Sequence, residues 1–234
     1  MFKDTATTEI YTLSLHDALP IYPRQLARDA ALLEAEGVSL LWAPPPGEVY
    51  PEGYATNVSV SGVSEGLCGA NRPGHFDGVA TVVCKLFNQV RPDMAFFGEK
   101  DWQQLAVIRR MARDLDLTRP HVDAIHGVAI VREDDGLAMS SRNAYLTVEN
   151  RAIAATLPRE MRLAIGRIVA GDATGTVLEA FRNRLLDAGF DSIDYAEIRD
   201  GRDLAPASEP GPGDRFFVAA RIGGTRLIDN MPVA

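Results

Sequence analysis

The sequence predicts an α/β fold: a parallel sheet followed by a smaller α+β domain. Up to Arg132, short apolar runs with the character of strands alternate with amphipathic segments of helical period, which is typical of parallel strands joined by right-handed crossovers. Beyond Arg132 the order changes to helices followed by strands, which favours a separate α+β domain. We therefore place a domain boundary near Val131.

The elements before this boundary are predicted from periodicity and from their stop signals. Helices are predicted at residues 24–36, where Gly37 ends the segment, at 78–90 and at 101–115. Strands are predicted at residues 38–43, 56–63, 93–97 and 124–132. The first of these strands is expected to be buried, because its run is apolar and stops at three consecutive prolines.

The elements after the boundary carry clear end signals. Thr147 is a good N-cap with Glu149 in the first turn, which predicts a helix to about residue 169. A second helix is predicted at 176–188, ended by Gly189. Short strands are predicted at residues 192–198, 215–221 and 225–228.

Composition excludes several classes of protein. The 234 residues contain 46% hydrophobic and 24% charged residues, which is ordinary globular usage. A net charge of -8 argues against a general nucleic-acid or membrane-surface binder. The sequence shows no signal peptide and no apolar run of about 20 residues that would span a membrane. Only Cys68 and Cys84 occur, so we expect no disulfide framework and a cytoplasmic location.

The most informative feature is a lysine at the point where an apolar strand turns into a helix, within Met-Ala-Phe-Phe-Gly-Glu-Lys-Asp-Trp-Gln-Gln from residue 94 to 104. Ligands of α/β proteins sit at the carboxyl ends of strands, and a helix N-terminus there favours an anion. Lys100 adds a charge suited to phosphate. Residues 139–143, Met-Ser-Ser-Arg-Asn, could bring hydroxyls and a guanidinium to the same anion.

Each of these residues also has a purely structural interpretation. Asp101 and Gln104 have the spacing of a capping box, Lys100 alone would be a solvated surface lysine, and Gly98 would allow a tight turn. The serines at 140 and 141 would be ordinary loop residues. His75, after Pro-Gly at a helix start, would be a structural hydrogen-bonding group.

Three segments together resemble the pantothenate synthetase family: Arg72–Val79, Gly98–Gln104 and Gly136–Asn143. Their order and spacing are similar too, and the likeness runs from about Tyr22 to the C-terminus. The resemblance implies a Rossmann-like first domain, incomplete at its N-terminus. It implies a homodimeric ligase of coenzyme A biosynthesis that joins pantoate to β-alanine with ATP, through a pantoyl-adenylate, releasing AMP and pyrophosphate.

The resemblance also favours functional roles for the residues of these segments. It implies Lys100, Ser140, Ser141 and Arg142 as catalytic residues. It implies that ATP contacts these four and Gly98, Glu99, Asp101, Val131 and Met139, that Gln104 binds pantoate, and that Arg72 and His75 lie beside the site as second-tier candidates. No protein-bound metal site is expected, because no histidine has zinc-ligand spacing; Mg²⁺ would arrive with ATP.

Two family segments are missing from the sequence, Met-Gly-x-Leu-His-x-Gly-His and Asn-Pro-x-Gln-Phe. Residues 11–21 resemble translated adapter DNA, so we expect residues 1–21 to be a non-family head, artefactual or disordered, ahead of a partial nucleotide-binding domain (22–131) and a lid domain (132–234). A divergent natural N-terminus is the alternative.

Three functions follow from this comparison of present and missing motifs. The first is a pantothenate-forming ligase impaired by the missing histidines. The second is a non-catalytic remnant that folds, dimerises and binds nucleotide. The third is a nucleotidyltransferase with another acceptor, against which Gln104 and the downstream domain argue.

Overall fold

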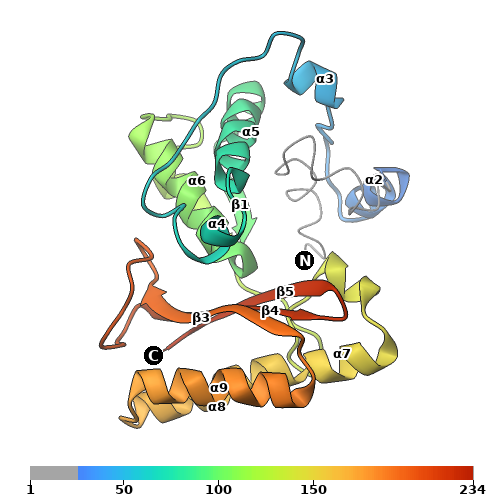
Figure 1. Cartoon of the computed structure of the whole chain (residues 1–234). Helices are drawn as coiled ribbons and strands as arrows, with labels where there is room; N and C mark the ends of the chain where they lie inside the picture. Colours follow the sequence, from blue (N-terminus) through green and yellow to red (C-terminus); the bar gives the residue numbers. More distant parts are fainter. Residues whose placement is uncertain (1–25, 234) are drawn as a thin grey trace. The chain divides into compact units, whose positions relative to one another are not determined.

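The computed structural model describes residues 26–233, and expectations about residues 1–21 lie outside this range. The protein is α/β, with a parallel sheet and a separate small antiparallel sheet, which confirms the predicted fold class (Figure 1). The described chain forms two compact units that alternate along the sequence. One comprises the residues up to Val60, Pro73–Phe96 and Val107–His126, and the other comprises Ser61–Arg72, Phe97–Ala106 and the chain from Gly127 on. The domain boundary near Val131 stays a prediction.

A βαβ element occupies residues 95–128, ahead of the C-terminal helices and strands. It consists of β1 (Ala95–Gly98), the 3-10 helix η1 (Glu99–Asp101), α6 (Trp102–Asp114), η2 (Val122–Ala124) and β2 (Ile125–Val128), and α5 (His75–Val90) lies before it. The two strands pair as a two-stranded sheet. Arg109 of α6 donates from Nε and Nη2 to the Ile125 carbonyl at 3.0 and 2.9 Å, which fixes the helix to the start of β2. These elements were predicted to within a few residues.

Two predicted strands are wrong. Residues 38–43 lie between α2 (Leu26–Ala35) and α3 (Pro46–Val49) without strand structure, and Leu40 is 76% exposed. Residues 56–63 form no ladder either: the Val58 amide donates to Thr81 Oγ1 at 2.9 Å. The reason is the same for both, because an extended segment becomes a strand only when a neighbouring strand accepts its backbone hydrogen bonds.

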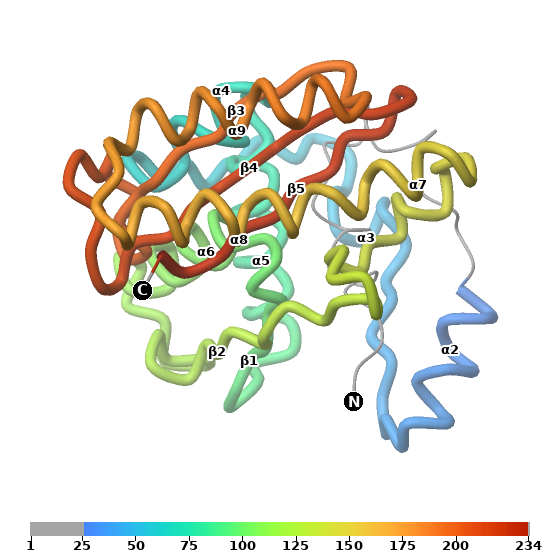
Figure 2. Tube along the Cα trace, turned by 90° about the horizontal axis from the view of Figure 1, so that it is seen from below, coloured from blue at the N-terminus to red at the C-terminus, as the bar shows by residue number. Residues whose placement is uncertain are grey.

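The C-terminal part is a three-stranded antiparallel sheet with helices on one face (Figure 1). Its elements are η3 (Ser141–Tyr145), α7 (Val148–Ala154), α8 (Thr156–Val169), α9 (Thr174–Ala188), β3 (Ser192–Asp200), β4 (Asp214–Ile222) and β5 (Thr225–Pro232). The short helix α4 (Leu67–Asn71) belongs to the same compact unit but comes earlier in the chain. Figure 2 shows α8 and α9 side by side along the sheet, and the two helices contact each other. Phe181 of α9 and Phe216 of β4 are both fully buried, with ring centroids 5.0 Å apart. This face is the core.

The caps of this part confirm the predicted helix ends. Thr147 Oγ1 accepts from the Asn150 amide at 3.2 Å, and Gly189 ends α9 at φ +111°. The predicted helix to residue 169 is interrupted at Ala155, between α7 and α8. Pro158 explains the break, because it lacks the amide that would bond one turn back and is tolerated only in a first turn. No helix in the described part of the chain is long and apolar enough to cross a membrane.

Candidate functional site

The lysine of the strand-to-helix turn is held in a buried position. β1 ends at Gly98, and η1 runs directly into α6, so Asp101 lies inside a helical turn. The capping-box interpretation of Asp101 and Gln104 is therefore wrong, and so is a tight turn at Gly98, whose φ of -66° suits any residue. The Lys100 side chain is only 9% exposed, with Nζ 3.6 Å from Asp101 Oδ2. Lys100 is thus not a solvated surface lysine.

A short hairpin delivers the serine and arginine segment. The Met139 amide donates to the Val131 carbonyl at 2.9 Å, and Arg132 and Ala138 form an antiparallel β-bridge through their backbones. The chain then enters η3, where Ser140 Oγ accepts from the Arg142 amide at 3.2 Å. A serine hydroxyl has one donor beside its lone pairs, so Ser140 can cap η3 and still donate its proton to a ligand.

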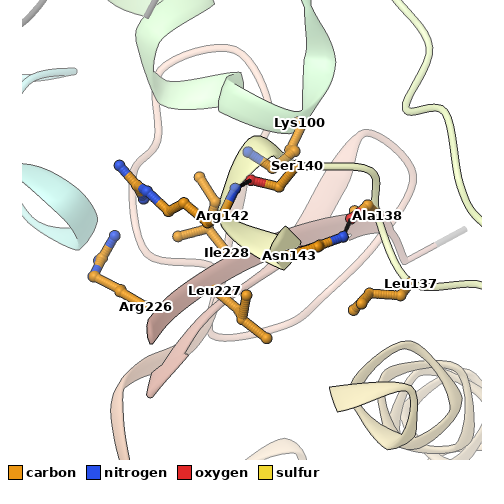
Figure 3. Close-up of a pocket in the computed structure, with 9 residues that line it drawn as sticks. All are labelled: Lys100, Leu137, Ala138, Ser140, Arg142, Asn143, Arg226, Leu227 and Ile228. Carbon is orange, nitrogen blue, oxygen red and sulfur yellow. Dashed lines mark hydrogen bonds between the residues drawn. The ribbon is translucent and has the colours of Figure 1, made fainter. Parts of the chain in front are cut away.

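One pocket brings the lysine and the hairpin segment together (Figure 3). It is lined by Lys100, Leu137, Ala138, Ser140, Arg142, Asn143, Arg226, Leu227 and Ile228. Three of these residues are cationic, and none carries a carboxylate. Figure 3 shows Lys100 coming from η1, Ser140 and Arg142 from the η3 segment, and Arg226 from β5. A concave surface with this charge attracts an anion rich in oxygen, such as a phosphate chain.

Arg226 was not predicted from the sequence. Its Nε donates to Asp194 Oδ2 at 2.7 Å, and its Nη1 and Nη2 lie 3.5 and 3.6 Å from Cys68 Sγ. Burial raises the pKa of Asp194, but hydrogen bonds from Arg226 and Arg221 outweigh it and hold that pKa below its usual range. Asp194 is therefore ionised and anchors the guanidinium. No local motif signalled Arg226, because the strands of the sheet bring it to the pocket.

Asn143 contributes a hydrogen-bond acceptor to a pocket whose charged residues are all donors. Its Nδ2 donates to Glu133 Oε1 at 3.0 Å and to the Ala138 carbonyl at 3.1 Å, which fixes the orientation of the amide. Its Oδ1 is buried and has no hydrogen-bond partner within the described residues. This oxygen can accept only from a donor, so it suits a hydroxyl or an amine better than a phosphate.

The other predicted site residues lie outside the pocket lining. Ser141 opens η3, Met139 is 38% exposed, and Val131 is half-buried at the hairpin base. Glu99 lies against β2, where a Cβ added at Gly127 would come within 2.7 Å of its Oε1. Arg72 caps α4 and His75 begins α5.

Gln104 is half-buried on α6, and the buried glutamine of the pair is its neighbour Gln103. Gln103 accepts from the Cys68 amide at 3.0 Å and donates to the Val63 carbonyl at 3.1 Å, which is a structural role. Gln103 thus has a structural role, and the pantoate-binding role of Gln104 stays a prediction.

Comparison with known proteins identifies the family. Residues 13–232 match the family model described as Pantoate-beta-alanine ligase. A protein of Novosphingobium aromaticivorans named pantothenate synthetase is 64% identical over 93% of this chain and 77% of its own length. A protein of Sphingopyxis alaskensis with the same name is 55% identical over 91% and 75%.

The chain belongs to the pantoate-beta-alanine ligase family. Solved structures agree: pantothenate synthetase from Thermus thermophilus has a TM-score of 0.86 at 44% identity, covering 97% of this chain and 81% of that one. The Francisella tularensis ligase, complexed with beta-gamma ATP and beta-alanine, has a TM-score of 0.71 at 29% identity, covering 91% and 71%. The family match starts at residue 13, ahead of Tyr22, where the resemblance was expected to begin.

Proposed function

We propose that this chain is a ligase that condenses pantoate with β-alanine, using ATP to form a pantoyl-adenylate. One observation carries the proposal: in a member of the ligase family, a single pocket gathers Lys100, Ser140 and Arg142 with no carboxylate in its lining. In this chemistry a pantoate carboxylate oxygen attacks the α-phosphorus of ATP as the bond to pyrophosphate breaks. The β-alanine amine then attacks the acyl carbon, loses a proton and displaces AMP.

The pocket residues match the charges that develop in the first step. The Lys100 ammonium and the Arg142 guanidinium are placed to stabilise the leaving pyrophosphate, and the Ser140 hydroxyl to donate to a phosphate oxygen. Because Lys100 is mostly removed from water, its charge interacts more strongly than a surface lysine would. No enzyme nucleophile is required, so the work of the protein is positioning and charge stabilisation.

Further roles belong to the same proposal and rest on the family resemblance. Asp101, Ser141, Met139 and the Val131 backbone contact ATP, Gln104 binds pantoate, and Mg²⁺ comes with the phosphates of ATP as part of the substrate. We also propose that the enzyme is cytoplasmic and a homodimer. Sedimentation of the purified chain tests the dimer.

The direct test is AMP release that depends on ATP, pantoate and β-alanine together. In a chain whose residues before Tyr22 are replaced by a family-like N-terminus, Lys100→Ala should lower this release by about 10² or more, as removal of a donor to developing charge typically does. Lys85→Ala is the matched control, because Lys85 lies over the Tyr54 ring at 4.6 Å and does not line the pocket. Equal loss in both variants would exclude Lys100 from the site.

Nucleotide binding without turnover is the second candidate. It is favoured because the 234-residue sequence holds no His-x-Gly-His segment, whose donors would share the stabilisation of the triphosphate. We therefore expect little pantothenate from the 234-residue chain, and recovery of AMP release when a family-like N-terminus replaces the residues before Tyr22. Robust turnover by the unmodified chain would contradict the impairment. No turnover by the restored chain would contradict the ligase proposal.

A further inference from the structure

Two consecutive buried residues of β5, Asp229 and Asn230, hold the two halves of the pocket. They are 3% and 2% exposed, in a strand that contacts both η1 and η3. Neither lines the pocket itself. The Asn230 side chain bonds to the turn that carries Lys100, and the Asp229 side chain bonds to the hairpin before Ser140. The strand β5 therefore supports both segments.

Asn230 is bonded to the backbone of the lysine turn. Its Nδ2 donates to the carbonyls of Glu99 and Lys100 at 2.9 and 3.0 Å. Its Oδ1 accepts from Arg215 Nε and Nη2 at 2.9 and 2.6 Å. Both amide hydrogens and both oxygen lone pairs are therefore used, and an ionised carboxylate in the same place could accept from Arg215 but could not donate to the two carbonyls.

Arg215 and Trp102 complete the support of the lysine turn. The Arg215 guanidinium carbon lies 3.8 Å from the centroid of the Trp102 ring. Trp102, the first residue of α6, donates from Nε1 to the Gly201 carbonyl at 2.7 Å. The turn that carries Lys100 is thus held at its backbone by Asn230 and at its exit by a stacked, hydrogen-bonded indole.

Asp229 performs the corresponding task for the hairpin. Its carboxylate accepts from Arg132 Nη1 and Nη2 at 2.7 and 2.9 Å, and Arg132 Nη1 also donates to the Gly136 carbonyl at 3.0 Å. A bidentate pair of this kind fixes orientation as well as distance. The hairpin leads directly into Ser140 and Arg142, so its position sets theirs.

We propose that Asp229 and Asn230 are positioning residues, which set the place of Lys100 relative to the Ser140–Arg142 segment through contacts from one strand. This inference rests on the proposed function, because it assumes that the pocket binds the phosphates of ATP. Asn230 acts through Lys100, so the benefit of the Lys100 charge should depend on Asn230.

A double-mutant cycle on ATP affinity, measured by calorimetry with ATP itself, tests that dependence. Asn230→Asp replaces the donor with an oxygen that faces two carbonyl oxygens, while it keeps the acceptor for Arg215. We expect Lys100→Ala to weaken ATP binding about tenfold in the parent chain and less than about twofold in the Asn230→Asp chain. Asn230→Ala, which removes the amide without the repulsion, provides the same comparison if the aspartate variant melts below the assay temperature.

Asn88→Asp is the matched control, because Asn88 also donates from Nδ2 to a backbone carbonyl, that of Cys84, at 2.9 Å. In that background the Lys100→Ala factor should stay about tenfold. The same factor in the Asn230 backgrounds would overturn the positioning role and leave the proposed function intact. Failure of the parent chain to bind ATP would overturn the proposed function and this inference with it.

Discussion

The two sheets of this protein differ in how completely they are covered. In the three-stranded sheet, β4 is buried along most of its length, and Phe216 is fully enclosed by α8 and α9 packing. In the two-stranded sheet, Phe96 of β1 is 58% exposed and Val128 of β2 is 41% exposed. Two strands alone bury too little apolar surface for independent stability, whereas three strands with helices on one face form a core.

This difference shows what each sheet contributes. The three-stranded sheet buries its apolar residues on the helical face, and polar residues of β5 bond to η1 and to Arg132 in the hairpin before η3. From the two-stranded sheet, the lysine turn starts at the carboxyl end of β1, and Glu99 of that turn lies against Gly127 of β2. The side-chain hydrogen bonds that hold the lysine turn and the hairpin therefore come from the C-terminal sheet.

The largest effect should be on the free energy of unfolding, in a comparison of one buried and one exposed phenylalanine. Phe216→Ala is expected to lower the free energy of unfolding by about 3–5 kcal/mol, because it leaves a cavity beside Phe181 in a closed core. Phe96→Ala should change it by less than about 0.5 kcal/mol, since most of that ring already meets solvent. Urea unfolding of both variants measures the contrast. Equal losses would mean that the exposed sheet is as well packed as the other.

The next largest effect should be on ATP binding in the pocket beside the C-terminal sheet. Arg142→Ala should weaken ATP binding about tenfold or more, as loss of a charge-assisted hydrogen bond costs about 1.5–3 kcal/mol. Arg110→Ala serves as control, because Arg110 pairs with Asp114 at 2.7 Å on the exposed side of α6. Calorimetry that finds unchanged affinity for the Arg142 variant would remove this residue from the site.

A smaller effect tests the helix that follows the pocket. Thr147→Ala removes the side-chain acceptor of the Asn150 amide and should cost about 1 kcal/mol of stability. Thr176→Ala is the matched substitution inside α9, at an exposed position, and should be neutral or slightly stabilising because alanine is the better helix former. Thermal unfolding distinguishes them, and indistinguishable melting temperatures would argue against a role for the cap.

The smallest effect should depend on pH. Hydrogen bonds from Arg151 hold the pKa values of Glu133 and Asp135 below their usual range, so this stabilisation is present above about pH 4–5 and is lost as pH falls through the folded values. Arg151→Ala should cost less than about 1 kcal/mol near neutral pH, because the pairs are partly exposed, and progressively less as the pH falls through the folded pKa values. Arg151→Lys should keep part of the difference. A cost that is constant across this range would contradict the linkage.

The sequence predicted most of the fold because its signals were local. Thr147 and Gly189 mark helix ends by their own chemistry, and the apolar period of residues 78–90 requires a helix wherever it packs. Residues 38–43 had the right composition for a strand, but whether a neighbouring strand pairs with them is a tertiary property that composition does not contain.

The candidate site was predicted only where its residues belong to motifs. Lys100, Ser140 and Arg142 were predicted together, and the structure places them in one pocket. Arg226 and Asn230 were missed, because they reach the site through sheet pairing. The sequence predicts that the last strand ends at residue 228, because the polar residues Asp229 and Asn230 follow. In the structure β5 continues through both of them to Pro232. Two polar residues inside a buried strand require partners.

The turn between β4 and β5 has a consequence for how sequences of this kind can change in length. Gly223 and Gly224 adopt φ values of +54° and +78°, a two-residue hairpin turn that pairs Ile222 with Thr225. One inserted residue on β5 would turn every later side chain to the opposite face. Insertions should therefore be tolerated in the loop between β3 and β4, and be excluded between this turn and the asparagine that holds the lysine.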